Sequence, residues 1–143
     1  GFFDLHCRNR GLGNSYCSES AGTHGWHVGQ PPDPRSISAA AAWNVDISKD
    51  LSQQVGFEDF HRFDHILAMD NSNLGHLNAL DPGTGTARLS LLLTFGEATS
   101  GTDVPDPYFG GDAGFDTICR ILNQASAGFL DHVENIRLES GLP

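Results

Sequence analysis

The hydrophobic positions of the chain follow helical spacing in three stretches. From Gly114 onward, apolar residues recur at three- and four-residue steps, which predicts a long amphipathic helix. They are Phe115, Ile118, Leu122, Ala125, Phe129, Val133 and Ile136. The same spacing over residues 2–10, closed by Gly11, predicts a helix at the start of the chain. Asp33 before Pro34 is a typical N-cap and first-turn pair and predicts a helix that stops near Asn44.

Short apolar runs between these stretches predict strands. "HILAMD", residues 65–70, reads as a buried parallel strand whose carboxyl end faces a site, and a short helix over 71–80 follows it. "RLSLLLTF", residues 88–95, is apolar and bounded by turn residues, and residues 16–20 are a further strand candidate. Helices that alternate with short apolar strands predict an α/β fold with one open parallel sheet.

The size and charge of the chain limit the number of domains and the kinds of partner. A chain of 143 residues with 38% hydrophobic residues fits one domain, residues 1–143. A net charge of -10 argues against nucleic acid or an anionic membrane as the main partner. No signal peptide or apolar membrane span is visible, so we expect a cytoplasmic protein. Three widely spaced cysteines predict reduced thiols.

Two loops carry residues that need an explanation. In "DVPDPYFGG", Asp106 stands between Pro105 and Pro107, which fix the backbone on either side of a carboxyl group that could act as a general acid. The alternative is that Asp106 only stabilises a turn between the two prolines. The other loop, rich in glycine and proline, carries Trp26, and such loops often carry function.

Three stretches resemble the low-molecular-weight protein-tyrosine-phosphatase family in order and spacing. They are "SAGTHGWHVGQPPDPR", "FHRFDHILAMDNSNL" and "DVPDPYFGGDAGF". The resemblance implies a three-layer fold with a four-stranded parallel sheet flanked by helices, and a phosphate-binding loop of the form Cys-x5-Arg-Ser/Thr after the first strand. It implies hydrolysis of phosphotyrosine proteins or small aryl phosphates through a cysteinyl-phosphate intermediate, without a cofactor.

The resemblance also assigns roles to individual residues. It implies that Asp106 is the general acid and that Trp26, Tyr108 and Phe109 wall the substrate slot. Asp70 and Ser72 would support the phosphate loop, in the positions of the family's Asp-x-Ser-Asn-Leu motif. Helix capping is an equally good explanation of these last two residues.

The phosphate loop itself does not occur in the sequence. Six positions after the three cysteines stand Gly13, Thr23 and Ala125, and none of them is arginine. "GLGNSYCS" contains the Leu-Gly-Asn of the family loop but lacks its cysteine and arginine at the required places. We therefore expect the first strand and the phosphate loop to lie upstream of Gly1, and the chain by itself to be inactive.

Other interpretations remain open at this stage. Where the family has residues that support the loop, this chain has Asn44, Lys49 and residues 52–54, which favours a pseudophosphatase that only binds its partner. An arsenate reductase of the same fold would need paired redox cysteines. We expect no metal site, because the histidines and cysteines of residues 6–27 lack the paired short spacings of zinc ligands.

Overall fold

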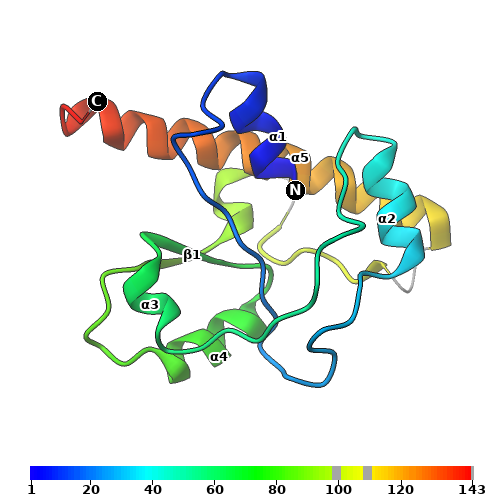
Figure 1. The fold of residues 1–143 in the computed structure, drawn as a ribbon, viewed down its shortest axis with the longest axis horizontal. Helices are drawn as coiled ribbons and strands as arrows, with labels where there is room; N and C mark the ends of the chain where they lie inside the picture. Colours follow the sequence, from blue (N-terminus) through cyan, green and yellow to red (C-terminus); the bar gives the residue numbers. More distant parts are fainter. Residues whose placement is uncertain (98–100, 108–110, 143) are drawn as a thin grey trace.

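The computed structural model describes residues 1–97, 101–107 and 111–142, which form one α/β unit (Figure 1). Its elements are, in order, α1 (Phe2–Asn9), α2 (Pro34–Ala41), α3 (Asp59–Arg62), β1 (His65–Ala68), α4 (Asn71–Leu80), β2 (Arg88–Leu91), the 3-10 helix η1 (Leu92–Phe95) and α5 (Gly111–Glu139).

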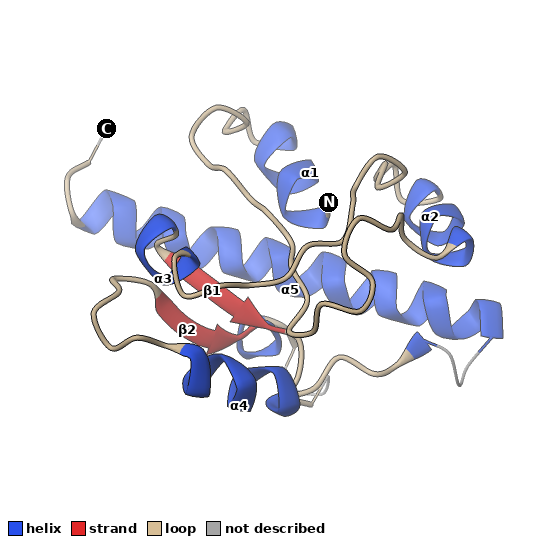
Figure 2. Ribbon diagram, turned by 60° about the horizontal axis from the view of Figure 1, so that its bottom comes forward, coloured by secondary structure: helices blue, strands red, loops and turns tan. Residues whose placement is uncertain are grey.

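The elements form three layers. The long helix α5 lies along one side of the sheet, and α1 and α2 pack against it, while α4 covers the other side (Figures 1 and 2). Leu67 of β1 packs against the core residues of α5, and Ala68 packs against Leu77 of α4. Successive strand residues thus face opposite layers, as the pleat of a strand requires.

The sheet of the described residues has two parallel strands. β1 pairs with β2 in the register His65 with Arg88 through Ala68 with Leu91. The connection through α4 makes this a β-α-β unit, so the parallel α/β prediction is confirmed. Beyond residue 91 the second predicted strand turns into η1, because the chain there leaves β1 and packs on α5 instead.

The predicted strand at residues 16–20 was wrong. These residues have no regular structure, and the nearest strand-like pairing is a single bridge between Gly22 and Gln54. A strand requires a neighbour to which its backbone groups can bond. No strand among the described residues lies beside β1 on the edge opposite β2.

The core follows the hydrophobic spacing of α5. Phe115, Ala125, Phe129 and Val133 are buried, as their spacing predicted, and the helix begins at Gly111, slightly earlier than expected. The other predicted helices occur near their expected positions, and Asp33 caps α2 by accepting a hydrogen bond from the Arg35 N–H at 2.8 Å. Within the described ranges, no helix has the length and apolar character needed to cross a membrane.

Candidate active site

The candidate site begins where β1 ends. Two residues after the strand, Asp70 caps α4 by accepting a hydrogen bond from the backbone N–H of Asn73 at 2.7 Å. The carboxyl edge of a parallel sheet, next to the start of the following helix, is the usual place for ligands in α/β proteins. The structure therefore gives Asp70 the capping role that was one of its two predicted roles, and leaves its loop-support role untested.

The segment that carries Asp106 is fixed to this edge. The backbone N–H of Val104 donates a hydrogen bond of 2.9 Å to the carbonyl of Met69, and Val104 packs against the core. Asp103 accepts hydrogen bonds from the backbone and side-chain nitrogens of Asn71, at 3.0 and 2.6 Å. Asp106 follows two residues after Val104 and is exposed, so an acid at this position stands near the start of α4.

The loop that carries Trp26 approaches the same helix through His24. The Trp26 side chain is 78% exposed and stacks on His24, with ring centroids 4.5 Å apart. The His24 ring in turn contacts His76 of α4 edge-on, at 5.1 Å. The Trp26 loop and the Asp106 segment therefore both lie against α4, one through His76 in the middle of the helix and the other through Asn71 at its start.

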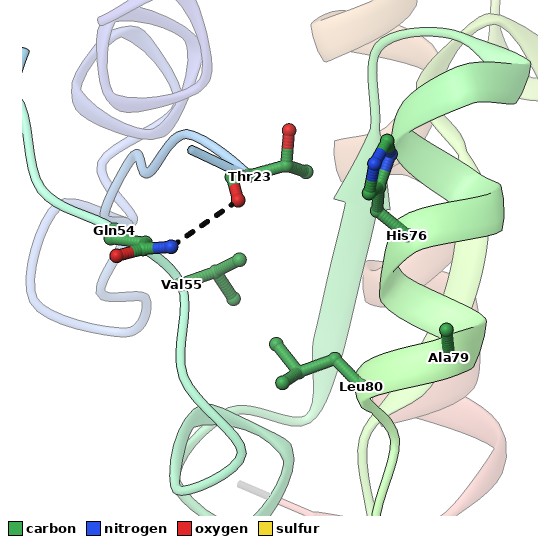
Figure 3. A pocket seen from close by; sticks show the side chains of 6 residues that line it. All are labelled: Thr23, Gln54, Val55, His76, Ala79 and Leu80. Atoms are coloured by element: carbon green, nitrogen blue, oxygen red, sulfur yellow. Dashed lines mark hydrogen bonds between the residues drawn. The ribbon is translucent and has the colours of Figure 1, made fainter. Parts of the chain in front are cut away.

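A pocket of about 260 Å³ lies beside this contact, between α4 and the two segments that carry Thr23 and Gln54 (Figure 3). Thr23, Gln54 and Val55 line one side, and His76, Ala79 and Leu80 of α4 line the other. The Gln54 side chain donates a hydrogen bond of 3.4 Å to the Thr23 carbonyl across the loop side of the pocket. The pocket is thus polar toward Thr23 and His76 and apolar at its other end.

Two of the three cysteines, Cys7 and Cys119, are not placed as activated nucleophiles. Cys7 is buried in the core between α1 and α5, and burial, followed by the nearby Asp4 carboxylate, raises the pKa of its thiol. Burial likewise raises the pKa of Cys119, with Asp116 adding to the effect. A nucleophilic cysteine needs the opposite shift, because the thiolate is the reactive form. Cys17 is exposed in the irregular segment before the bridge residue Gly22.

The remaining predicted residues divide into two groups. Ser72 is the second residue of α4, where its backbone carbonyl accepts a hydrogen bond from His76 Nδ1 at 2.9 Å. Tyr108 and Phe109 lie outside the described residues. Asp103 and Asn71 tie the acid-bearing segment to α4. Their contact could not be predicted from the sequence, because it joins positions 32 residues apart.

The arrangement defines an α/β protein with its candidate site at the carboxyl edge of a parallel sheet, beside the helix that follows the first described strand. The family model described as "Low molecular weight phosphotyrosine protein phosphatase" matches residues 1–139. The chain belongs to that family.

Individual relatives agree with this assignment. The chain is 31% identical over 133 residues to the low molecular weight protein-tyrosine-phosphatase YfkJ of Bacillus subtilis, covering 93% of this chain and 83% of that protein. The crystal structure of a protein tyrosine phosphatase from Entamoeba histolytica, with Hepes in its active site, superimposes with a TM-score of 0.85 at 31% identity, covering 98% of this chain and 86% of that one. A Drosophila arginine phosphatase superimposes with a TM-score of 0.82 at 28% identity, covering 92% and 85%.

Proposed function

We propose that this chain forms the acid-bearing and substrate-binding part of a phosphatase that hydrolyses phosphotyrosine through a cysteinyl-phosphate intermediate. The observation that carries the proposal is the hydrogen bond between the Val104 N–H and the Met69 carbonyl, which fixes the Asp106 segment at the carboxyl end of β1. In that position a carboxylic acid can reach a group held at the sheet edge.

The nucleophile, in this proposal, comes from a polypeptide segment that the 143 residues do not contain. The sequence has no Cys-x5-Arg motif, and the two buried thiols have raised pKa values. In the described structure β1 has no strand neighbour opposite β2, and residues 16–21 form no ladder. A further parallel strand beside β1 would bond to its open edge and would deliver the loop after it to the carboxyl edge of the sheet.

The proposed reaction uses this chain's residues in two ways. In the first step, the cysteine thiolate of the additional segment attacks phosphorus and displaces the phenolic oxygen, to which Asp106 in its acid form donates a proton. In the second step, the Asp106 carboxylate takes a proton from the water that hydrolyses the cysteinyl phosphate. Trp26, Tyr108 and Phe109 hold the aryl ring, since a deep aromatic slot favours tyrosine over the shorter serine phosphate. Asp70 and Ser72 support the phosphate loop from the start of α4.

A complementation experiment tests the proposal. The 143-residue chain is co-expressed with a peptide that carries an apolar strand followed by Cys-x5-Arg-Ser, and turnover of free phosphotyrosine is measured. We expect activity only when both parts are present. In the active pair, Asp106→Asn should lower kcat by about 10²- to 10⁴-fold, the usual contribution of a general acid.

The matched control is Asp112→Asn, the same change at an exposed acid in the first turn of α5. It should leave the rate unchanged. An Asp106→Asn variant as fast as the unmodified pair would remove Asp106 from the mechanism. A pair that binds phosphotyrosine peptides without turnover would instead support the pseudophosphatase interpretation, for which the changed support residues Asn44 and Lys49 argue.

The substrate class is tested with the same material. Because one solved structure similar to this chain is described as an arginine phosphatase, phosphoarginine is assayed beside phosphotyrosine. The exposed Trp26 ring provides a flat wall suited to an aryl group, so we expect kcat/KM to favour phosphotyrosine. A preference for phosphoarginine would reverse the assignment of substrate while retaining the assignment of Asp106.

A further inference from the structure

Two histidines from distant parts of the chain meet beside Trp26. His24 lies in the loop that precedes α2, and His76 lies in the middle of α4, yet their ring centroids are 5.1 Å apart. Both side chains are exposed. Two imidazoles that approach this closely can share a metal ion, because neutral imidazole suits zinc, copper and nickel.

The hydrogen bond of His76 leaves its Nε2 available, and the contact of His24 is compatible with the same tautomer. The Nδ1 N–H of His76 donates to the backbone carbonyl of Ser72 at 2.9 Å, and His24 Nδ1 lies 3.1 Å from the Thr23 hydroxyl, which can accept a hydrogen bond. A neutral imidazole whose Nδ1 donates keeps its lone pair on Nε2. Histidine ligands of metals usually have this kind of second hydrogen bond, which fixes the tautomer and the ring.

The separation of the rings also fits a shared ion. Two imidazoles bound to one tetrahedral ion at about 2.0–2.1 Å have their ring centroids about 5 Å apart. The centroids of His24 and His76 are 5.1 Å apart without any ion. The centroid separation is therefore compatible with a shared ion, and binding requires the two rings to turn their Nε2 atoms toward it.

We propose that His24 and His76 form a two-histidine site for a divalent transition-metal ion such as Ni²⁺ or Zn²⁺. In the described residues no group of three or more His, Cys, Asp and Glu side chains could hold a metal, so two imidazoles are the protein ligands and water completes the coordination. The ion links the Trp26 loop to α4. This site differs from the sequence-based expectation of no metal, because residues 24 and 76 are too far apart in the sequence for spacing to relate them.

Nickel binding to the 143-residue chain tests the site directly and requires no phosphatase activity. Cys17→Ser is used as the parent, because Cys17 is an exposed thiol that could bind the ion by itself. Isothermal titration calorimetry with NiCl₂ should show one saturable site. Either His24→Gln or His76→Gln should weaken its Kd at least about tenfold, since each removes one of two ligands.

His27→Gln is the matched control. His27 is an exposed histidine of the same loop, and its Nδ1 forms a hydrogen bond with Gln30 Oε1 at 3.2 Å. This variant should bind Ni²⁺ within about twofold of the parent, and far-ultraviolet circular dichroism checks that each variant keeps its helices. If one of the two glutamine variants loses helix content, the alanine variant at the other histidine is titrated with NiCl₂ instead, and its Kd is compared with that of the parent.

The proposal is overturned if both glutamine variants at positions 24 and 76 bind as tightly as the parent, or if His27→Gln weakens binding equally. Its failure would leave the phosphatase proposal untouched, because that proposal needs Asp106 and an additional segment but no ion. A failed complementation would in turn leave the nickel result standing.

Discussion

Gly128 of α5 provides a sharp test of how the long helix packs. A Cβ atom built on Gly128 would lie 2.0 Å from the carbonyl oxygen of Phe95, the last residue of η1. Real Cβ atoms essentially never approach another heavy atom within 3.0 Å. The neighbour is backbone, so a side-chain rotation cannot relieve the contact, and Gly128→Ala must push η1 away from α5.

Two opposing contributions determine how Gly128→Ala changes the free energy of unfolding. Alanine is about 0.8–1.0 kcal/mol better than glycine inside a helix. Overpacking a tight contact typically costs about 1–3 kcal/mol, and the separation demanded here places this case at the upper end. We therefore expect Gly128→Ala to lower the free energy of unfolding by about 1–2 kcal/mol, which corresponds to a Tm about 2–8 °C lower for a chain of this length.

The control is the same substitution where space is open. A Cβ at Gly75, an exposed residue of α4, meets nothing within 4 Å. Gly75→Ala should therefore gain the helical preference alone and raise the stability by about 0.5–1 kcal/mol. Urea denaturation followed by circular dichroism measures both variants. The reasoning about the contact between α5 and η1 is refuted if Gly128→Ala is as stable as Gly75→Ala.

Two further predictions concern ionisable side chains. Ellman's reagent should label Cys17 rapidly in the native protein and the two buried cysteines only after denaturation. The Cys17→Ser variant should therefore lack the fast phase of labelling. Fast labelling of all three thiols would contradict the burial of Cys7 and Cys119. Burial, with a hydrogen bond from the Tyr16 hydroxyl to Glu134, raises the pKa of Tyr16 from 10.0 to about 12. The folded state therefore retains a proton that the unfolded chain loses, so this contribution to stability is complete below pH 10 and declines as the pH rises toward 12. Urea denaturation at pH 9 and pH 11 should show a smaller loss of stability for Tyr16→Phe than for the unmodified protein, and equal losses would count against the assignment.

Periodicity predicted the helices well because α5 and α2 obey local rules. The apolar residues of α5 repeat at the helical period, and Asp33 supplies the N-cap that its position before Pro34 indicated. These signals act within a few residues and do not depend on distant contacts. The strand at 65–68 was also visible because both of its faces are covered, by α5 and by α4.

Contacts between distant segments could not be predicted in this way. Residues 16–20 were a strand candidate, but their backbone has no strand partner among the described elements. Leu92 and Leu93 continue an apolar run, yet the chain leaves the sheet there because these side chains are buried against α5. In both cases tertiary packing decides between strand and another conformation. The resemblance of short motifs singled out Asp70 and Asp106, whose site roles stay predictions, whereas the contacts of Asn71 and His76 emerged only from the folded geometry.

Helix α4 is the element that relates these site residues to one another. Asp70 caps its N-terminus, Asn71 in its first turn binds Asp103 at 3.0 Å, and His76 in its second turn meets His24 at 5.1 Å. Residues 70 and 76 are six positions apart, which is about 9 Å along a helix. The acid-bearing segment and the loop of Trp26 are therefore held at a fixed spacing by one rigid element rather than by each other. If both proposals hold, an ion bound by the two histidines restrains the Trp26 loop without displacing Asp106, so its effect on a complemented enzyme should fall on KM for aryl substrates rather than on the proton-transfer step.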